Sequence, residues 1–218
     1  MTVDLITLKD PRSAAAEAFR TLRTNLMFSK LAGDKPLHTL LLTSPATSDD
    51  KSMACANLAV TFAQAGHKTI LVDADLRRPA QHEIWNISNE RGLMTLMLEE
   101  SAMANPPLVP TEIDGLSILP SGPLPSVPAD VLSNPRMGEV IGVLKARADY
   151  IIFDASPVLA ASDAALLGSK VDGVLLVVRA GNTRRDHVSQ AKQALEQVRA
   201  FLIGAVLTNA PQERTKNY

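Results

Sequence analysis

The sequence predicts an α/β protein with a doubly wound, mostly parallel sheet of about seven strands and helices on both faces. Short apolar runs, many of them β-branched, alternate along the chain with longer segments of helical pattern, which is the order of a sheet with crossover helices. Several runs are apolar at consecutive positions, as expected of strands that are covered on both faces. The strand candidates are residues 38–43, 69–73, 116–119, 150–154, 173–178 and 203–208.

Residues 1–33 are expected to form a helical segment that precedes the first strand. A helix is predicted to begin after Ser13, because apolar residues recur behind it at helical spacing. The apolar stripe consists of Phe19, Leu22 and Leu26, and the remaining arc carries Glu17, Arg20 and Arg23. On its own, such a charged arc is typical of a helix face in contact with solvent.

The rest of the chain gives no sign of a second domain, so residues 1–218 are expected to fold as one unit. Seven prolines lie between residues 106 and 128, which predicts a surface loop around the short strand at 116–119. Residues 210–218 are expected to form a flexible tail. Cys55 is the one cysteine of the chain, which excludes an internal disulfide, and we expect it to be a small buried residue on a helix.

The composition is that of a soluble globular protein, with 46% hydrophobic and 21% charged residues. A formal net charge of -1 gives no reason to expect nucleic-acid binding. The N-terminus lacks the apolar core of a signal peptide, and no run approaches the roughly 20 apolar residues that span a bilayer. We therefore expect a cytoplasmic chain without direct membrane insertion, so that any membrane role comes through a partner.

A phosphate-binding loop is predicted between the strand at 38–43 and a helix that starts near Met53. The connecting residues 43–52 read TSPATSDDKS, which combines a strand end, a turn and a Lys-Ser pair. In such a P-loop, backbone amides cradle phosphates, the lysine reaches the terminal phosphates and the serine hydroxyl holds Mg²⁺. The expected contact residues are Ala46, Thr47, Ser48, Asp49, Asp50, Lys51, Ser52 and Met53. Glycine is absent between Gly33 and Gly66, however, so the loop alone is also compatible with a chance match.

Carboxylates close two of the apolar strands that follow this loop. Asp73 ends the strand at 69–73 and is followed by Asp75, and Asp154 ends the strand at 150–154. The carboxyl ends of parallel strands meet at one edge, where carboxylates can bind Mg²⁺ and can orient or deprotonate an attacking group. Aspartates also cap helices, but three of them in this order favour a magnesium and phosphate site.

Together these motifs resemble the bacterial tyrosine kinases that control capsule and exopolysaccharide export. The similarity runs from about Ser13 to Asn209, and it implies the fold of the P-loop NTPases of the partitioning-ATPase class. It rests on EAFRTLR at 17–23, the loop ending in Lys51-Ser52, NLAV at 57–60, VDADLRRP at 72–79, LPSGPLPSVPADVL at 119–132, the strand ending at Asp154 and VDGVLLVVRAGNTRRD at 171–186.

The resemblance implies ATP and Mg²⁺ as cofactors and assigns roles to the residues that match the family motifs. The implied catalytic set is Lys51 on the phosphates, Asp73 as the base for a tyrosine hydroxyl, and Asp75 and Asp154. Ser52, Asp75 and Asp154 would serve the magnesium ion, and Asn209 would contact adenine.

The resemblance also implies partners. The helix with Glu17, Arg20 and Arg23 resembles the family's self-association motif. A membrane-embedded polysaccharide co-polymerase or activator is the implied second partner, and it would recruit the chain to the inner face of the membrane.

Departures from the family pattern predict weak or lost ATP binding. The family has loop glycines, Thr-Pro-Pro after the third aspartate and a C-terminal tyrosine cluster, where this chain has Ala46, Ser48 and Asp50, then Ala155-Ser156-Pro157, and the single tail residue Tyr218. A carboxylate about 5 Å from a phosphate oxygen costs about 3 kcal/mol at an effective dielectric of about 20. A positive φ at Ala46 or Ser48 would add about 1 kcal/mol of strain.

Three functions are compatible with the sequence. The departures favour a degenerate kinase-family chain that acts as a regulatory or scaffolding subunit in polysaccharide synthesis and export. An active ATP-dependent tyrosine autokinase is the alternative, because the lysine, the serine and all three aspartates are present. A partitioning or positioning ATPase ranks last, because such proteins usually carry an extra lysine early in the loop, where this chain has Pro45 and Ala46.

Overall fold

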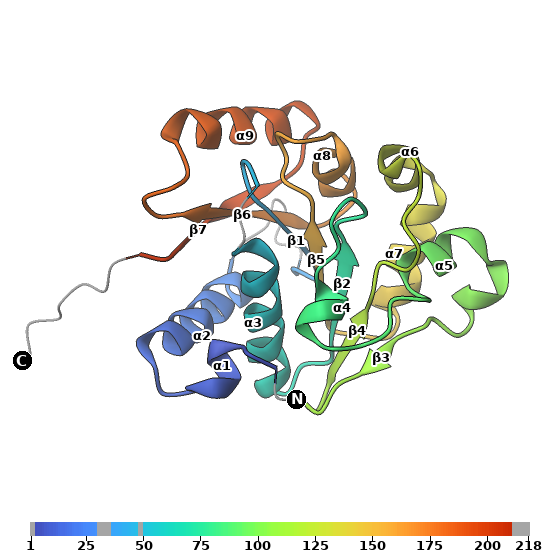
Figure 1. Ribbon diagram of the computed structural model, residues 1–218, viewed down its shortest axis with the longest axis horizontal. Helices are drawn as coiled ribbons and strands as arrows, with labels where there is room; N and C mark the ends of the chain where they lie inside the picture. The colour runs from blue at the N-terminus through green and yellow to red at the C-terminus, as the bar shows by residue number, and fades with distance from the viewer. Residues whose placement is uncertain (1–2, 30–35, 48–49, 211–218) are drawn as a thin grey trace, which may run out of the picture.

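The described residues form one seven-stranded sheet (Figure 1) in a computed structural model that describes residues 3–29, 36–47 and 50–210. The strand order is β3-β4-β2-β5-β1-β6-β7, and every neighbouring pair is parallel except β3 with β4. The strands are β1 (Thr39–Thr43), β2 (Thr69–Ala74), β3 (Val109–Pro110), β4 (Leu116–Leu119), β5 (Tyr150–Ala155), β6 (Gly173–Arg179) and β7 (Leu202–Thr208). The predicted doubly wound, mostly parallel sheet is confirmed.

The six predicted strands agree with the observed ones to within one residue at either end, and β3 is the strand that the sequence did not reveal. It has two residues, one of them Pro110, and lies at the sheet edge, where a missing N–H removes no ladder bond. The same proline-rich segment also forms helix α6 (Pro128–Ser133), which begins with a proline because the fixed φ of proline suits the first helical position. The prediction of a loop around one strand was therefore too simple.

Helices cover both faces of the sheet (Figure 1). On one face lie α1 (Ile6–Lys9), α2 (Ala14–Met27), α3 (Lys51–Gln64) and α4 (Gln81–Ile84). On the other face lie α5 (Leu93–Leu98), the short 3₁₀ helix η1 (Glu100–Met103), α6, α7 (Arg136–Lys145), α8 (Asp163–Gly168) and α9 (Arg185–Gln197). The strands alternate between the two cores: Leu42 and Ile152 join the first, and Leu41 and Phe153 join the second. None of the helices in the described part of the chain is long and apolar enough to cross a bilayer.

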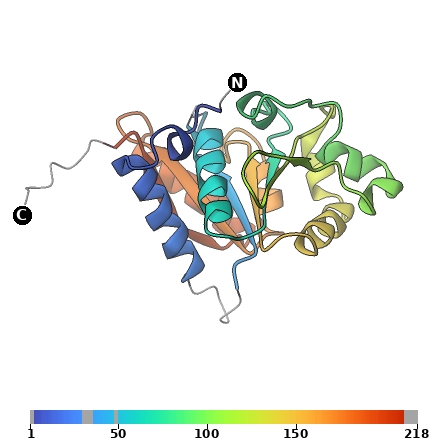
Figure 2. The same ribbon diagram turned by 90° about the horizontal axis from the view of Figure 1, so that it is seen from below.

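Helix α2 begins where the sequence predicts it. Ser13 Oγ accepts a hydrogen bond of 3.1 Å from the backbone N–H of Ala16 and so caps the helix. Leu26 is buried in the same core as α3, and α2 runs alongside α3 (Figure 2). Cys55 lies on α3 and is fully buried, as predicted.

The carboxyl ends of the parallel strands meet at one edge of the sheet and position the candidate site. β5 lies between β2 and β1, and its Asp154 is paired in register with Asp73 of β2 and with Leu42 of β1. Helix α3 starts at this edge, after the loop that follows β1. The three segments that the sequence singled out therefore meet there.

Candidate nucleotide and magnesium site

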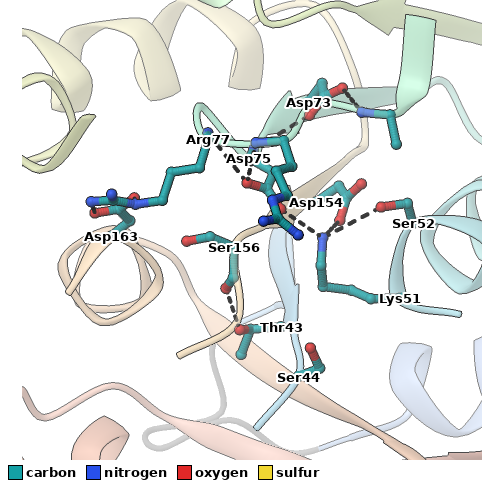
Figure 3. Close-up of polar contacts among 12 residues, drawn as sticks. Thr43, Ser44, Lys51, Ser52, Asp73, Asp75, Arg77, Asp154, Ser156 and Asp163 are labelled. Carbon is teal, nitrogen blue, oxygen red and sulfur yellow. Dashed lines mark hydrogen bonds and ion pairs between the residues drawn. The ribbon is translucent and has the colours of Figure 1, made fainter. Parts of the chain in front are cut away.

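Lys51, the first residue of α3, lies among the three side chains that were predicted to serve magnesium (Figure 3). Its Nζ contacts Asp154 Oδ1, lies 3.5 Å from Asp75 Oδ2 and lies 3.4 Å from Ser52 Oγ. Lys51 is 3% exposed, and Asp154 has no exposed surface. Four predicted site residues therefore form one cluster, in which Lys51, Asp75 and Asp154 are buried and Ser52 is partly buried.

One ammonium and two carboxylates make up the charge of this cluster. Burial is the largest single influence and would lower the pKa of Lys51, but Asp154 and the other neighbouring acidic groups, Asp75 among them, together outweigh it and hold the pKa above its usual value. The lysine is therefore a permanent cation. Because Lys51, Asp75 and Asp154 are all buried, removing the lysine leaves two uncompensated carboxylates in the interior.

The side chains around Lys51 Nζ fit Mg²⁺. Hydroxyl and carboxylate oxygens are hard ligands, and Mg²⁺ at nucleotide sites is usually held by one or two carboxylates, phosphate oxygens and water. Ser52, Asp75 and Asp154 are such ligands, and the ammonium contacts all three. Within residues 3–29, 36–47 and 50–210, no group of three or more His, Cys, Asp or Glu side chains could hold a metal ion by itself. Magnesium at this edge would therefore depend on bound phosphates for the rest of its ligands.

Asp73 turns away from the cluster. One carboxylate oxygen accepts hydrogen bonds from the backbone N–H groups of Ala80 and Gln81, at 3.0 and 2.8 Å, and the other accepts one from Asp75 N at 3.3 Å. Asp73 has no exposed surface, and burial, followed by the charge of Asp154, raises its pKa to about 8. A tyrosine hydroxyl can therefore reach Asp73 only after the start of α4 has moved.

Asp50 directs its carboxylate towards the ends of β6 and β7. Its Oδ2 accepts a hydrogen bond of 3.0 Å from Thr208 Oγ1 and lies 3.3 Å from Arg179 Nε. The backbone of Asp50 is in the right-handed helical region, and Ala46 is not among the described non-glycine residues with positive φ. The strain that was expected at Ala46 is therefore absent, and the repulsion that was expected from Asp50 is offset by Arg179.

The first part of the phosphate loop is tied to the chain that follows β5. Ser44 O accepts a hydrogen bond from Val158 N at 2.9 Å, and Pro45 O accepts one from Leu159 N at 3.2 Å. Thr47 is exposed. The predicted contact residues Ser48 and Asp49 lie outside the described residues.

Asn209, Asp50 and Met53 line a shared cavity of about 230 Å³. Phe19 of α2 and Asn57 of α3 also line it. Aromatic and thioether surfaces beside amide and carboxylate groups are the kind of lining that suits a flat heteroaromatic base. Three residues that were assigned to nucleotide binding are thus brought together at the end of β7.

The chain has similar relatives among known proteins. Tyrosine-protein kinase YwqD of Bacillus subtilis (strain 168) is 36% identical over 218 residues, which are 100% of this chain and 91% of the relative. The chain belongs to the bacterial tyrosine kinase family. The putative tyrosine-protein kinase CapB of Staphylococcus aureus is 32% identical over 208 residues, 95% of this chain and 90% of that protein. The crystal structure of the chimerical protein CapA2B2 matches 97% of this chain and 92% of its own, with a TM-score of 0.89 at 36% identity. No family model matches the chain.

The partitioning-ATPase alternative has no support beyond the fold. The MinC:MinD cell division protein complex of Aquifex aeolicus matches 78% of this chain and 68% of its own chain, with a TM-score of 0.65. Its sequence identity is 17%, which indicates a shared fold alone. The bacterial tyrosine kinases, at about twice that identity, match nearly the whole chain.

The charged residues of helix α2, which were predicted to mediate self-association, make contacts within the chain. Arg20 Nη1 pairs with Glu17 Oε2 at 2.7 Å, and Arg20 Nη2 donates to Pro11 O at 2.6 Å. Arg23 Nη1 donates to Thr61 O of α3 at 3.0 Å. Self-association through Glu17, Arg20 and Arg23 stays a prediction.

Two buried polar side chains of this kinase-family site were not predicted from the sequence. Asp163, at the start of α8, binds Arg77 through two contacts of 2.6 and 3.0 Å (Figure 3). Gln81, at the start of α4, donates to Asp154 Oδ2 and to Ser52 O. An isolated acid or amide at a helix start is typical of a cap, so no local signal separates these residues from ordinary caps. The sheet topology is what brings their partners to them.

Proposed function

We propose that this chain is a Mg·ATP-dependent tyrosine kinase domain of capsule or exopolysaccharide synthesis, and that its glycine-free loop weakens ATP binding. The convergence of Lys51 with Ser52, Asp75 and Asp154 carries the proposal. Mg·ATP would supply the transferred phosphoryl group, and such transfers depend on positioning and charge stabilisation rather than on covalent chemistry by the protein. Membership of the tyrosine kinase family supports tyrosine as the acceptor.

Each side chain of the cluster has a part in this proposal. Lys51 would leave Asp154 to neutralise phosphate charge, while Ser52, Asp75 and Asp154 would hold magnesium. In the described arrangement Asp73 holds the start of α4 through the backbone N–H groups of Ala80 and Gln81, and its pKa of about 8 leaves it mostly protonated near neutral pH. Its role as the base for a tyrosine hydroxyl, which the family resemblance implies, therefore stays a prediction.

Weak binding is expected because Asp50 still carries a side chain where the family has glycine. Arg179 and Thr208 hold its carboxylate, so the repulsion is smaller than the roughly 3 kcal/mol of an unpaired charge at that distance. A remaining penalty of about 1–2 kcal/mol would lower the affinity for ATP roughly 5- to 30-fold. This penalty leaves measurable binding.

The tyrosine that accepts phosphate lies outside the described residues or in another protein. Tyr150 is the one tyrosine that the structure describes, and it lies at the start of β5, at the opposite end of the strand from Asp154. Its ring packs on Phe62, with ring centroids 4.3 Å apart. Tyr218, the candidate acceptor of the tail, lies outside the described residues.

A regulatory or scaffolding subunit without phosphoryl transfer is the second candidate, and the absence of loop glycines favours it. The two candidates share the fold and the family. They differ in whether ATP is bound and used.

Calorimetric titration with Mg·ATP tests the proposal. We expect the wild type to bind, and Lys51→Ala to lose that binding. A second assay follows transfer of labelled phosphate from ATP to a tyrosine-containing polymer, with Asp154→Asn as the inactive comparison. Binding without transfer would favour the scaffolding candidate, and a wild type that binds no ATP at all would remove the kinase proposal.

We also propose a cytoplasmic location at the inner face of the membrane, with a membrane-embedded polysaccharide co-polymerase or activator as the partner. Membership of the bacterial tyrosine kinase family, whose resemblance implies such a partner, supports this proposal. Cell fractionation tests it: deleting the co-polymerase should move the chain from the membrane fraction to the soluble fraction. A chain that stays at the membrane in the deletion strain would contradict this partner.

A further inference from the structure

Gln81 links three parts of the site through its side chain and has no exposed surface. Its Nε2 donates to Asp154 Oδ2 at 2.8 Å and to Ser52 O at 3.0 Å. Its Oε1 accepts a hydrogen bond of 3.2 Å from Trp85 Nε1. One amide therefore joins the end of β5, the first turn of α3 and the end of α4.

The partners of Gln81 leave one possible orientation for its amide. A carboxylate oxygen and a backbone carbonyl accept hydrogen bonds, whereas the indole N–H of Trp85 donates one. Turning the amide over would set its oxygen against two oxygens and its N–H₂ against the indole N–H. Both N–H groups and the carbonyl oxygen of Gln81 are thus in use.

The backbone of Gln81 is held as firmly as its side chain. Asp73 Oδ2 accepts hydrogen bonds from Ala80 N and Gln81 N, at 3.0 and 2.8 Å. Since Asp73 belongs to β2, the start of α4 is attached to the strand next to β5. The distance between the Gln81 amide and Asp154 is therefore set by the sheet.

We infer that Gln81 is a positioning residue for the magnesium ligands Asp154 and Ser52, an inference that rests on the function proposed above. The two oxygens of Asp154 have separate partners, Oδ1 with Lys51 and Oδ2 with Gln81. When Lys51 turns to a phosphate, the bond from Gln81 keeps the carboxylate in its present orientation. Removing such a hydrogen bond to a metal-holding carboxylate typically weakens metal binding about 10- to 100-fold.

Gln81→Met tests the inference, because methionine keeps the length of the side chain and removes all three hydrogen bonds. ATP binding is measured by calorimetry in a magnesium series and in excess EDTA. We expect the magnesium concentration for half-maximal ATP binding to rise about 10- to 100-fold, while ATP affinity in EDTA stays at the wild-type value. Gln193→Met, at an exposed position of α9, is the matched control. A merely structural role would weaken binding equally in both conditions.

Trp85 provides a second readout, since it is the one tryptophan of the chain and bonds directly to Gln81. Magnesium added to the wild type with ATP should change the tryptophan emission, and this change should disappear in Gln81→Met. If Gln81→Met does not fold, the same calorimetric titration is made with Trp85→Phe. This variant removes the hydrogen-bond donor to Gln81 Oε1 and should raise the magnesium concentration for half-maximal ATP binding roughly 2- to 10-fold.

The outcomes separate this inference from the proposed function. Wild-type magnesium dependence in a folded Gln81→Met variant, or in Trp85→Phe where the first does not fold, overturns the inference and leaves the proposed function intact. A wild type that binds no ATP, with or without magnesium, removes the proposed function and the inference with it. A rise in the half-maximal magnesium concentration of the variant, with wild-type ATP affinity in EDTA, supports both.

Discussion

The carboxylate of Asp50 lies 3.3 Å from Arg179 Nε and accepts a hydrogen bond from Thr208. The residue just before Lys51 is thereby attached to the ends of β6 and β7. A negative charge in a phosphate-binding loop is unfavourable when it stands alone, but here a cation from the neighbouring strand faces it. If the loop binds a nucleotide as proposed, Arg179 is expected to support that binding.

Replacing Arg179 with glutamine should weaken ATP binding. Both side chains of the pair are about one-third exposed, so the loss is expected to be modest, about 2- to 5-fold in affinity. Adding Asp50→Asn to Arg179→Gln should restore the wild-type affinity, because no unpaired charge remains. Calorimetry with Mg·ATP measures both effects, and Arg184→Gln, whose pair with Asp186 lies outside the cluster, is the control. An unchanged affinity in Arg179→Gln would show that the ion pair has no influence on the loop.

Replacing Lys51 with methionine should destabilise the fold. Asp75 and Asp154 would be left as buried carboxylates without a cation, which typically costs about 3–5 kcal/mol. Urea unfolding measures the free energy of unfolding, and the exposed Lys192→Met is the control. A loss no larger than that of the control would show that Lys51 does not stabilise the two buried carboxylates.

Asp73 should make stability depend on pH between about 4 and about 8. Its pKa is near 8 in the folded chain and near 3.8 in the unfolded chain, so the folded state holds a proton over this interval that the unfolded state has lost. Its contribution is therefore fully present below pH 4 and is lost as the pH rises through 8, by at most about 1.4 kcal/mol per pH unit.

The free energy of unfolding of the variant and of the wild type is measured by urea unfolding across this pH interval. Asp73→Asn should remove the part of its decline with rising pH that Asp73 causes, and the exposed Asp114→Asn should retain that decline. If the free energy of unfolding of Asp73→Asn falls with pH as steeply as that of the wild type, Asp73 is ionised in the folded chain throughout.

Reversing the charges of Arg20 and Arg23 should prevent self-association. Arg20→Glu/Arg23→Glu is expected to sediment as a monomer if the wild type assembles through α2. The control is Arg185→Glu/Lys192→Glu, which makes the same change of charge on exposed positions of α9. Both native arginines also bond within the chain, so thermal unfolding must show that the variant is folded. A folded variant with the mass of the wild type would exclude this helix as the interface.

The strand positions and the residues of the cluster around Lys51 were predictable because the sequence features that indicate them lie within a few neighbouring positions. The apolar run at 150–154 followed by Asp154 shows both a buried strand and a carboxylate at its end. The short strand β3 was missed because two residues carry no periodicity. The direction of the Asp73 carboxylate was missed as well, because α4, which it caps, has four residues and gives no sequence signal strong enough to compete with a catalytic motif.

The succession of strands and helices along the chain, the family, and the residues at the carboxyl edge of the sheet could all be inferred from the amino-acid sequence. Hydrophobic period and motif spacing are properties of neighbouring residues, and they can be recognised without knowing the fold. The pairing of Asp50 with Arg179, the cap that Asp73 places on α4 and the bond from Gln81 to Asp154 appear only in the folded chain. The partners of Asp50 and Gln81 are brought from distant parts of the chain by the sheet. A hydrogen bond or ion pair acts over about 3 Å, and no local pattern encodes which distant atom will stand at that distance.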